Sequence, residues 1–132
     1  MNYILDTNVL IFLGCGYEDR IGEKALEIYR DTKSDLFVSQ ISFWEMAIKI
    51  NIGKLYVPIG LKRLMNDTRQ AGIDMVPVKN SHILFYQSLE VHEKHKDPFD
   101  RFIISTALCE EMKIISGDSR FDLYTNATRV WD

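Results

Sequence analysis

Apolar positions along the chain follow two spacings that alternate from one end to the other. Short runs of mostly apolar, β-branched or aromatic residues predict strands, which we place at 2–5, 35–39, 73–78, 113–117 and 127–131. Between these runs apolar residues recur every three or four positions, which predicts helices at 7–15, 22–32, 41–55, 59–72, 81–92 and 97–112, with a turn of helix at 119–124. Because strands and helices alternate, we expect a single α/β domain over residues 1–132, with a central, mostly parallel β-sheet flanked by α-helices on both faces.

The composition is that of an ordinary globular domain, with 46% apolar and 27% charged residues in a chain of 132. The longest apolar run is far shorter than the roughly 20 residues that a membrane-spanning helix needs, and the N-terminus lacks the basic segment of a secretory signal. Cys15 and Cys109 have no metal-type spacing, so we expect buried free thiols rather than a disulfide. These features together predict a cytoplasmic protein.

The net charge of −3, from 16 basic and 19 acidic residues, argues against a general nucleic-acid-binding protein, which is typically basic. The objection weakens if some of the acids bind divalent cations, because two such ions would bring the formal charge to +1. The positions of the acids along the fold therefore matter more than their number.

Asp6 is the single charged residue within an otherwise apolar or neutral N-terminal segment, and a carboxylate is costly to bury unless something pairs with it. It follows the first predicted strand and Asp118 follows the fourth, so both lie at the carboxyl edge of a parallel sheet, where ligands bind. Helices that cover such a sheet begin at the same edge, which places Glu45, Asp97 and Asp100 there as well. The expected topology thus gathers acids that are far apart in sequence.

Each acid also has a purely structural explanation. Asp6 could cap the helix that follows it, and Glu45 lies three residues after a serine, the spacing of a capping box. Asp97 precedes a proline, an arrangement typical of a helix N-cap, and for this residue we favour the capping role. Asp100 would be a favourable anion in the first helical turn, and Asp118 could close an Asx-turn.

The joint pattern is harder to explain by capping. Four carboxylates at one edge repel one another, which raises some of their pKa values unless cations compensate. Oxygen ligands with no histidine or cysteine expected nearby fit Mg²⁺ or Mn²⁺ better than zinc. Clusters of this kind stabilise the attacking and leaving oxygens of a phosphodiester.

Four segments, "LDTNVL", "SFWEMAIKINIGKL", "DPFDRFIISTAL" and "IISGDSRF", together resemble the PIN-domain nucleases, and most of all the VapC-like toxins of bacterial toxin–antitoxin pairs. The resemblance covers essentially the whole chain in the expected order. It implies that the metal-binding and catalytic acids are Asp6, Glu45, Asp100 and Asp118. It also implies supporting positions, which hydrogen-bond the acids or a water, at Asn8, Ser42 and Ser116, with Asp97 as a further supporting residue or a cap.

The resemblance implies metal-dependent hydrolysis of RNA by the toxin of a toxin–antitoxin system, with a small antitoxin protein as partner. The chemistry itself does not require a 2′-hydroxyl, so the preference for RNA comes from the resemblance alone. Lys49 and Arg101 are candidate phosphate contacts, although solvated charges on a helix face explain them equally well. The alternative function is a non-catalytic PIN-like module that binds nucleic acid or protein.

Two further features remain open at this stage. His92 and His95 lie three apart, but no cysteine or other histidine completes a zinc site, so we expect a solvated loop. Phe43 and Trp44 could stack on a base or belong to the core.

The two helices between residues 45 and 70 carry more apolar surface than a peripheral hairpin needs, which favours a partner or oligomer surface, although a core role is equally compatible. We expect a homodimer. The apolar residues concerned are Ile50, Ile52, Leu55, Leu61, Leu64 and Met65.

Overall fold

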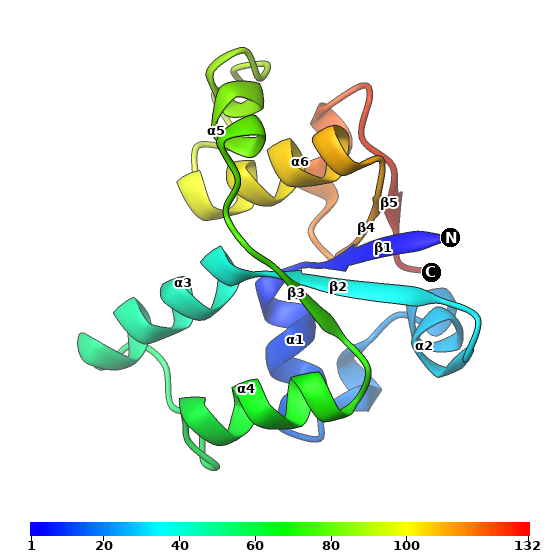
Figure 1. The fold of residues 1–132 in the computed structure, drawn as a ribbon, viewed down its shortest axis with the longest axis vertical. Helices are drawn as coiled ribbons and strands as arrows, with labels where there is room; N and C mark the ends of the chain where they lie inside the picture. Colours follow the sequence, from blue (N-terminus) through cyan, green and yellow to red (C-terminus); the bar gives the residue numbers. More distant parts are fainter.

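A computed structural model describes residues 1–132 and contains a five-stranded, all-parallel sheet in the order β3-β2-β1-β4-β5 (Figure 1). The strands are β1 (Asn2–Leu5), β2 (Asp35–Ser39), β3 (Asp74–Val76), β4 (Lys113–Ile115) and β5 (Arg129–Val130). The helices are α1 (Thr7–Gly14), α2 (Glu23–Arg30), α3 (Gln40–Asn51), α4 (Leu61–Gln70), α5 (Asn80–Gln87) and α6 (Pro98–Glu110), with 3₁₀ turns η1 (Glu18–Arg20) and η2 (Ser119–Leu123). The predicted α/β domain with a parallel sheet is therefore confirmed.

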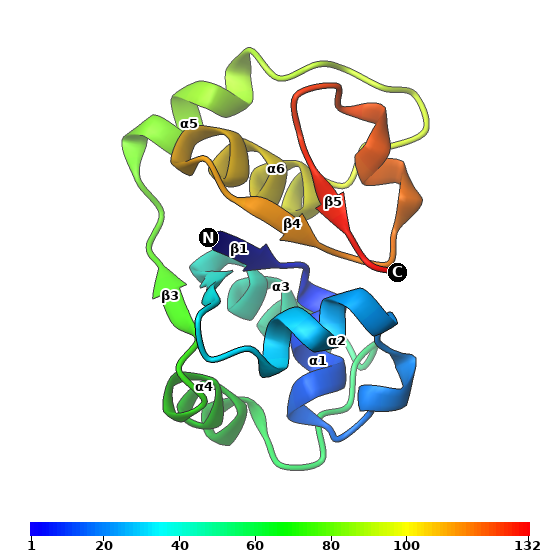
Figure 2. The ribbon, with the colours of Figure 1, turned by 90° about the vertical axis from the view of Figure 1, so that its right-hand side faces the viewer.

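Both faces of the sheet are covered, because successive side chains of a strand point to opposite sides. Tyr3 and Leu5 of β1 pack in a core beneath α1, α2, α3 and α4, whereas Ile4 packs in a second core with Ile103 and Ile104 of α6. Figures 1 and 2 show the sheet lying between these two layers, with α5 and α6 on one side. Strands buried on both faces explain the nearly continuous apolar runs from which they were predicted.

The order in which strands are added to the sheet reverses between β1 and β4, which are parallel neighbours. From β1 the chain adds β2 and then β3 on one side, and it returns to add β4 and β5 on the other. In open parallel sheets, ligands bind beyond the carboxyl ends of the strands at such a switch point. The residues that follow β1 and β4 therefore lie where this fold class places its functional sites.

All the predicted strands and helices are present, and each of the six helices is one to four residues shorter than its predicted range. Helix α3 ends at Asn51 because the chain turns through Gly53, whose φ is 75°. Helix α5 ends at Gln87, and an irregular connection leads from it to α6. This connection is not simply a solvated loop, as the sequence suggested, because Leu89 and His95 within it are buried.

Cys15 and Cys109 are free thiols, as expected, although both are only partly buried. None of the helices combines the length and apolar character needed to cross a membrane.

Candidate functional site

Asp6 and the loop that carries Asp118 are joined by Ser116, the first residue after β4. Leu5 pairs with Ile115 in the sheet, and the backbone N–H of Asp6 donates to the Ile115 carbonyl at 2.9 Å. The Ser116 hydroxyl donates to Asp6 Oδ2 at 2.7 Å and accepts from the backbone N–H of Asp118 at 3.0 Å. Ser116 thus supports two of the predicted acids, in agreement with the supporting role expected for it.

The capping explanation for Asp6 is not realised. Asp6 occupies the N-cap position of α1, yet its side chain makes no capping hydrogen bond. The carboxyl group is buried, and this burial, together with the negative charges of Glu45 and Asp118, raises the pKa of Asp6 to about 6. A buried acid that caps nothing and faces two other acids has no evident structural purpose.

Glu45 is buried in α3 and accepts a hydrogen bond from a hydroxyl group of α1. The Thr7 hydroxyl lies 2.8 Å from Glu45 Oε1 and 2.9 Å from the Ser42 hydroxyl. Because a carboxylate can only accept hydrogen bonds, the single hydroxyl proton of Thr7 points to Glu45. The Ser42 hydroxyl therefore donates to the Thr7 oxygen. Lys49, one turn along α3, pairs with Glu45 Oε2 at 2.8 Å.

The arrangement around Glu45 differs from the capping box that its spacing to Ser42 suggested. Helix α3 begins earlier, with Ser39 as its N-cap, and the Ser39 side chain accepts from the backbone N–H of Ile41. Ser42 is instead fully buried inside the helix and supports Glu45 through Thr7. Sequence reasoning missed Thr7, although a polar residue directly after Asp6 in an apolar helix is a usable signal.

Asp97 and Asp100 have different roles at the start of α6. Asp97 Oδ1 accepts from the backbone N–H groups of Phe99 at 2.8 Å and Asp100 at 3.2 Å, which confirms the predicted cap. Asp100 points into the site, where its side chain is 14% exposed. Burial, together with the negative charges of the neighbouring acids, Asp6 first among them, raises the pKa of Asp100 to about 8.

Asp118 combines a structural contact with a place in the site. Its Oδ1 accepts from the backbone N–H of Arg120, which closes the predicted Asx-turn. Both carboxylate oxygens also accept from the Arg120 guanidinium, the closest pair at 2.7 Å, and this ion pair lowers the pKa of Asp118. At the same time, ligand atoms of Asp118, Asp100 and His95 lie within 4.8 Å of one another.

His95 is, after Thr7, a second residue of the site that the sequence did not place there. It is fully buried, with Nε2 3.3 Å from Asp100 Oδ2 and Nδ1 2.8 Å from the Tyr124 hydroxyl. Burial and the nearby Arg120 guanidinium lower the pKa of His95, which favours the neutral ring. The expectation that no histidine lies near the acids is therefore wrong, because a loop side chain carries no periodicity that would mark it as buried.

The charges within the site do not balance. Lys49 pairs with Glu45 and Arg120 with Asp118, but neither Asp6 nor Asp100 forms an ion pair with lysine or arginine. Two carboxylates thus lack a cationic partner in surroundings that disfavour their ionised form. Because one divalent cation would compensate both, the residues of the site fit such an ion.

Two predicted residues behave differently from the expectation. Arg101 is not a phosphate contact, since it is buried and its Nη1 donates to the Glu90 carbonyl at 2.8 Å and to the Tyr124 hydroxyl at 3.0 Å. Asn8 makes no side-chain hydrogen bond to an acid. It is exposed and lines a hollow of about 290 Å³ together with Asp6 and Asp118.

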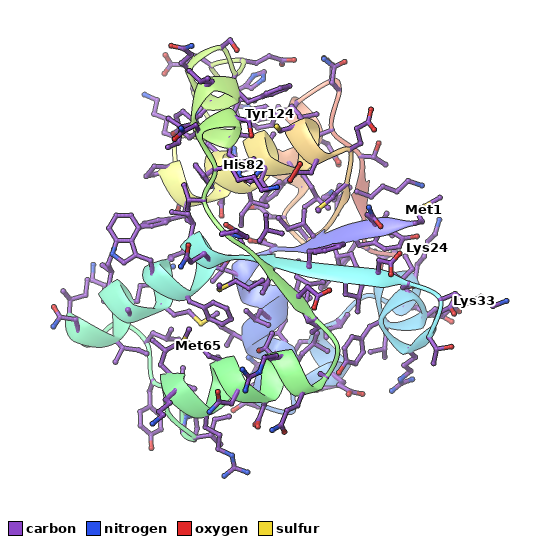
Figure 3. The ribbon with its side chains drawn as sticks, viewed as in Figure 1. Met1, Lys24, Lys33, Met65, His82 and Tyr124 are labelled. Carbon is purple, nitrogen blue, oxygen red and sulfur yellow. The ribbon has the colours of Figure 1, made fainter.

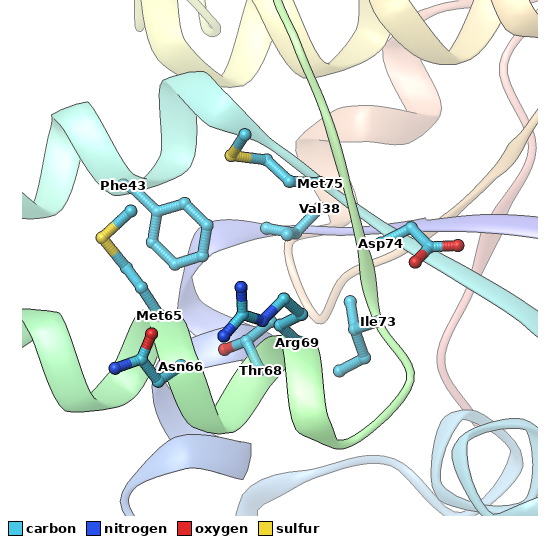
Figure 4. Close-up of a pocket in the computed structure, with 9 residues that line it drawn as sticks. All are labelled: Val38, Phe43, Met65, Asn66, Thr68, Arg69, Ile73, Asp74 and Met75. Carbon is cyan, nitrogen blue, oxygen red and sulfur yellow. The ribbon is translucent and has the colours of Figure 1, made fainter.

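The aromatic pair of α3 is divided between core and surface. Phe43 is buried and lines a second hollow of about 470 Å³ between α4 and β3, in which none of the four acids takes part (Figure 4). Trp44 is 59% exposed and makes an edge contact with Phe99, whose ring centre is 5.5 Å away. Of the two, Trp44 is the aromatic residue that a partner molecule could reach.

The metal-free protein is expected to lose stability as the pH rises from about 4 to about 8. In the folded chain the pKa values of Asp6 and Asp100 lie above their ordinary value of 3.8, so the folded state retains protons that the unfolded state has released. The free energy of unfolding therefore falls as pH increases through this window. Thermal melting in the presence of a chelator measures the effect.

The control for this prediction is Asp100→Asn, which removes the largest of these shifts and leaves other titrating groups, such as His95, in place. The difference in melting temperature between the variant and the wild type should grow with pH, in favour of the variant. A difference that is constant between pH 5 and pH 8 would contradict the raised pKa of Asp100.

Comparison with known proteins identifies a family and a shared fold. The family model for the PIN domain matches residues 3–126, whereas no curated protein sequence matches the chain significantly. Among solved structures, the chain is similar to VapBC2 from Rickettsia felis bound to a promoter DNA fragment, with a TM-score of 0.71, 17% identity and 100% of each chain covered. It is similar to VapBC-1 from nontypeable Haemophilus influenzae, with a TM-score of 0.67, 20% identity and coverage of 98% of this chain and 97% of that one. The chain is also similar to a toxin–antitoxin complex from Klebsiella pneumoniae, with a TM-score of 0.58, 17% identity and coverage of 96% of this chain and 95% of that one.

Proposed function

The chain belongs to the PIN-domain family, and we propose that it is a metal-dependent endoribonuclease that serves as the toxin of a toxin–antitoxin pair. The observation that carries this proposal is the convergence of Asp6, Glu45, Asp100 and Asp118 at the switch point of the sheet, where two of them lack a cationic partner. The similarity of the fold to VapBC structures and to a toxin–antitoxin complex supports the biological role.

The four acids would hold Mg²⁺ or Mn²⁺, because carboxylate oxygens are the ligands that these hard cations prefer. A divalent cation bound there supplies Lewis acidity, which favours the ionisation of water and offsets charge on the scissile phosphodiester. The free energy that Asp6 and Asp100 lose by burial and repulsion is recovered when a cation compensates them.

The residues around the acids keep each carboxylate in one orientation. Ser116 binds one oxygen of Asp6, and Thr7, itself held by Ser42, binds one oxygen of Glu45. Preorganised ligands need no rearrangement when the site acts, which is how such sites gain most of their effect. Lys49 is half-exposed beside Glu45, and we propose that its ammonium group contacts a backbone phosphate of the substrate.

A homodimer belongs to the same proposal. Two large apolar side chains lie close together on the surface, since Trp44 of α3 and Ile83 of α5 line one hollow with Phe99 and are 59% and 52% exposed. A concentration of exposed apolar residues marks a surface that is covered by a partner. The apolar residues of the helices 45–70 are divided, because Ile50, Ile52 and Met65 are exposed, whereas Leu64 is fully buried in the core.

Cleavage of RNA by the purified chain, and arrest of growth when it is expressed, test the proposal together. We expect RNA fragments to appear with Mg²⁺ or Mn²⁺ and not with a chelator, because the acids alone repel a phosphate. In cells, expression should stop growth, and co-expression of the product of an adjacent small gene should restore it.

The outcomes separate the parts of the proposal. Cleavage in vitro without an effect on growth would contradict the toxin role and leave the nuclease. Binding of RNA without cleavage, at any divalent cation concentration, would favour the alternative of a non-catalytic PIN-like binding module.

A further inference from the structure

A row of buried polar side chains, linked by hydrogen bonds, ends at Asp100. It runs from Arg101 of α6 through Tyr124, which follows η2, to His95, and each of these residues is less than a tenth exposed. The Arg101 Nη1 lies 3.0 Å from the Tyr124 hydroxyl, which lies 2.8 Å from His95 Nδ1. His95 Nε2 then lies 3.3 Å from Asp100 Oδ2. Figure 3 labels Tyr124 beside α6, on the side of the sheet that α5 and α6 cover.

The direction of these hydrogen bonds follows from what each group can do. A guanidinium only donates, so the Tyr124 oxygen accepts from Arg101. The Tyr124 hydroxyl has one proton, and His95 Nδ1 is the remaining partner within hydrogen-bond distance. If Nδ1 carried a proton, the buried hydroxyl would be left with no acceptor, which is costly. The neutral ring of His95 therefore carries its proton on Nε2 and donates it to Asp100.

Both ends of this row of hydrogen-bonded side chains are also fixed by packing. The Arg101 guanidinium lies over the Tyr86 ring at 5.2 Å and donates to the Glu90 carbonyl at 2.8 Å. The His95 ring packs against Phe121, with ring centres 5.4 Å apart. Side chains fixed in this way present the Nε2 proton of His95 to Asp100 in one position.

We propose that His95 is a positioning residue for Asp100, and that it is not itself a metal ligand. The proposal rests on the proposed function, since it takes Asp100 as a ligand of the cation. The hydrogen bond from Nε2 occupies Oδ2 of Asp100 and leaves Oδ1 for the cation, and the proton on Nε2 prevents His95 from donating a lone pair to the same ion. The ligand set then consists of oxygen atoms alone, which selects Mg²⁺ and Mn²⁺ over Zn²⁺ although a histidine is adjacent.

A matched pair of variants tests the positioning role. The amide nitrogen of His95→Gln can occupy the place of Nε2, whereas that of His95→Asn corresponds to Nδ1 and does not reach Asp100. We expect Mn²⁺ affinity, measured by titration calorimetry on the full chain, to fall roughly 10- to 100-fold in His95→Asn, the usual effect of losing a partner of a metal ligand. His95→Gln should recover most of that loss. Equal affinity in the wild type and a folded His95→Asn would overturn the proposal.

Two spectroscopic readouts on the wild-type chain do not depend on a variant folding. Nitrogen NMR of the metal-free protein should show the proton of His95 on Nε2, and a proton on Nδ1 would contradict the inferred direction of the hydrogen bonds from Arg101 to Asp100. Pulsed EPR of the Mn²⁺-loaded protein should show no coupling to a histidine nitrogen, and such a coupling would make His95, the histidine beside Asp100 and Asp118, a ligand. If the protein binds Mn²⁺ and shows both spectroscopic results but cleaves no RNA, the proposed function is overturned and the positioning role of His95 stands.

Discussion

Asp6→Asn is expected to abolish cleavage of RNA while the fold remains intact. The substitution keeps the size of the side chain and an oxygen that can accept from Ser116, but it removes the charge on which a cation depends. The loss should be on the order of 10²–10³-fold or more, the effect of removing one preorganised electrostatic group from an active site. Single-turnover cleavage of a labelled RNA at saturating Mg²⁺ or Mn²⁺ measures it.

The stability of the same variant distinguishes a site residue from a structural one. In metal-free buffer Asp6→Asn should melt no lower than the wild type, and at neutral pH somewhat higher, because burial and the charges of Glu45 and Asp118 disfavour the ionised carboxylate. In the wild type an added divalent cation should raise the melting temperature, since it binds the folded state alone. Full activity in Asp6→Asn would remove Asp6 from the set of metal ligands.

The variants Asp97→Ser and Asp100→Ser are expected to differ in turnover but not in stability, although the two residues lie within one helical turn. Serine caps a helix nearly as well as aspartate, so Asp97→Ser should retain its capping bonds to Phe99 and Asp100, and with them both stability and turnover. Asp100→Ser removes a carboxylate whose pKa the site raises to about 8, and turnover should fall on the order of 10²-fold or more. Cleavage rates and melting curves of the two variants, measured side by side, give the comparison.

A loss of turnover in Asp97→Ser that equals the loss in Asp100→Ser would make Asp97 a ligand in addition to a cap. A fall in the melting temperature of Asp97→Ser with turnover unchanged would instead mean that the cap depends on the charge of the carboxylate. In that case the favourable interaction of an anion with the N-terminus of α6 is the larger part of its effect.

The acids could be found from the sequence because their positions depend on topology alone. Asp6 directly follows an apolar run that is long enough for a buried strand, and Asp118 follows another. In a parallel sheet the ends of such strands meet at one edge whatever the details of packing. The cap at Asp97 was equally accessible, since a residue before a proline at the first helical turn depends on local geometry.

The environment of Arg101 could not be found in the same way. Its position beside Asp100 on the helix suggested a cation near the substrate, yet neighbouring helical residues point in directions about 100° apart. The side chain of Arg101 accordingly enters the second core, where the Tyr124 hydroxyl and the Glu90 carbonyl accept its hydrogen bonds. Which face of a helix is buried depends on what packs against it, and that information comes from distant segments.

Local patterns were enough to predict the alternation of strands and helices along the chain, the parallel sheet and the edge at which the four acids lie, because periodicity is read within one element and alternation implies parallel strands. Which groups accompany the acids depends instead on the packing of distant segments. Thr7 reaches Glu45 from another helix, and the buried loop residue His95 reaches Asp100 with Tyr124 behind it. Hydrogen bonds of this kind join residues whose separation in space is set by packing between layers, and no spacing along the chain records that distance.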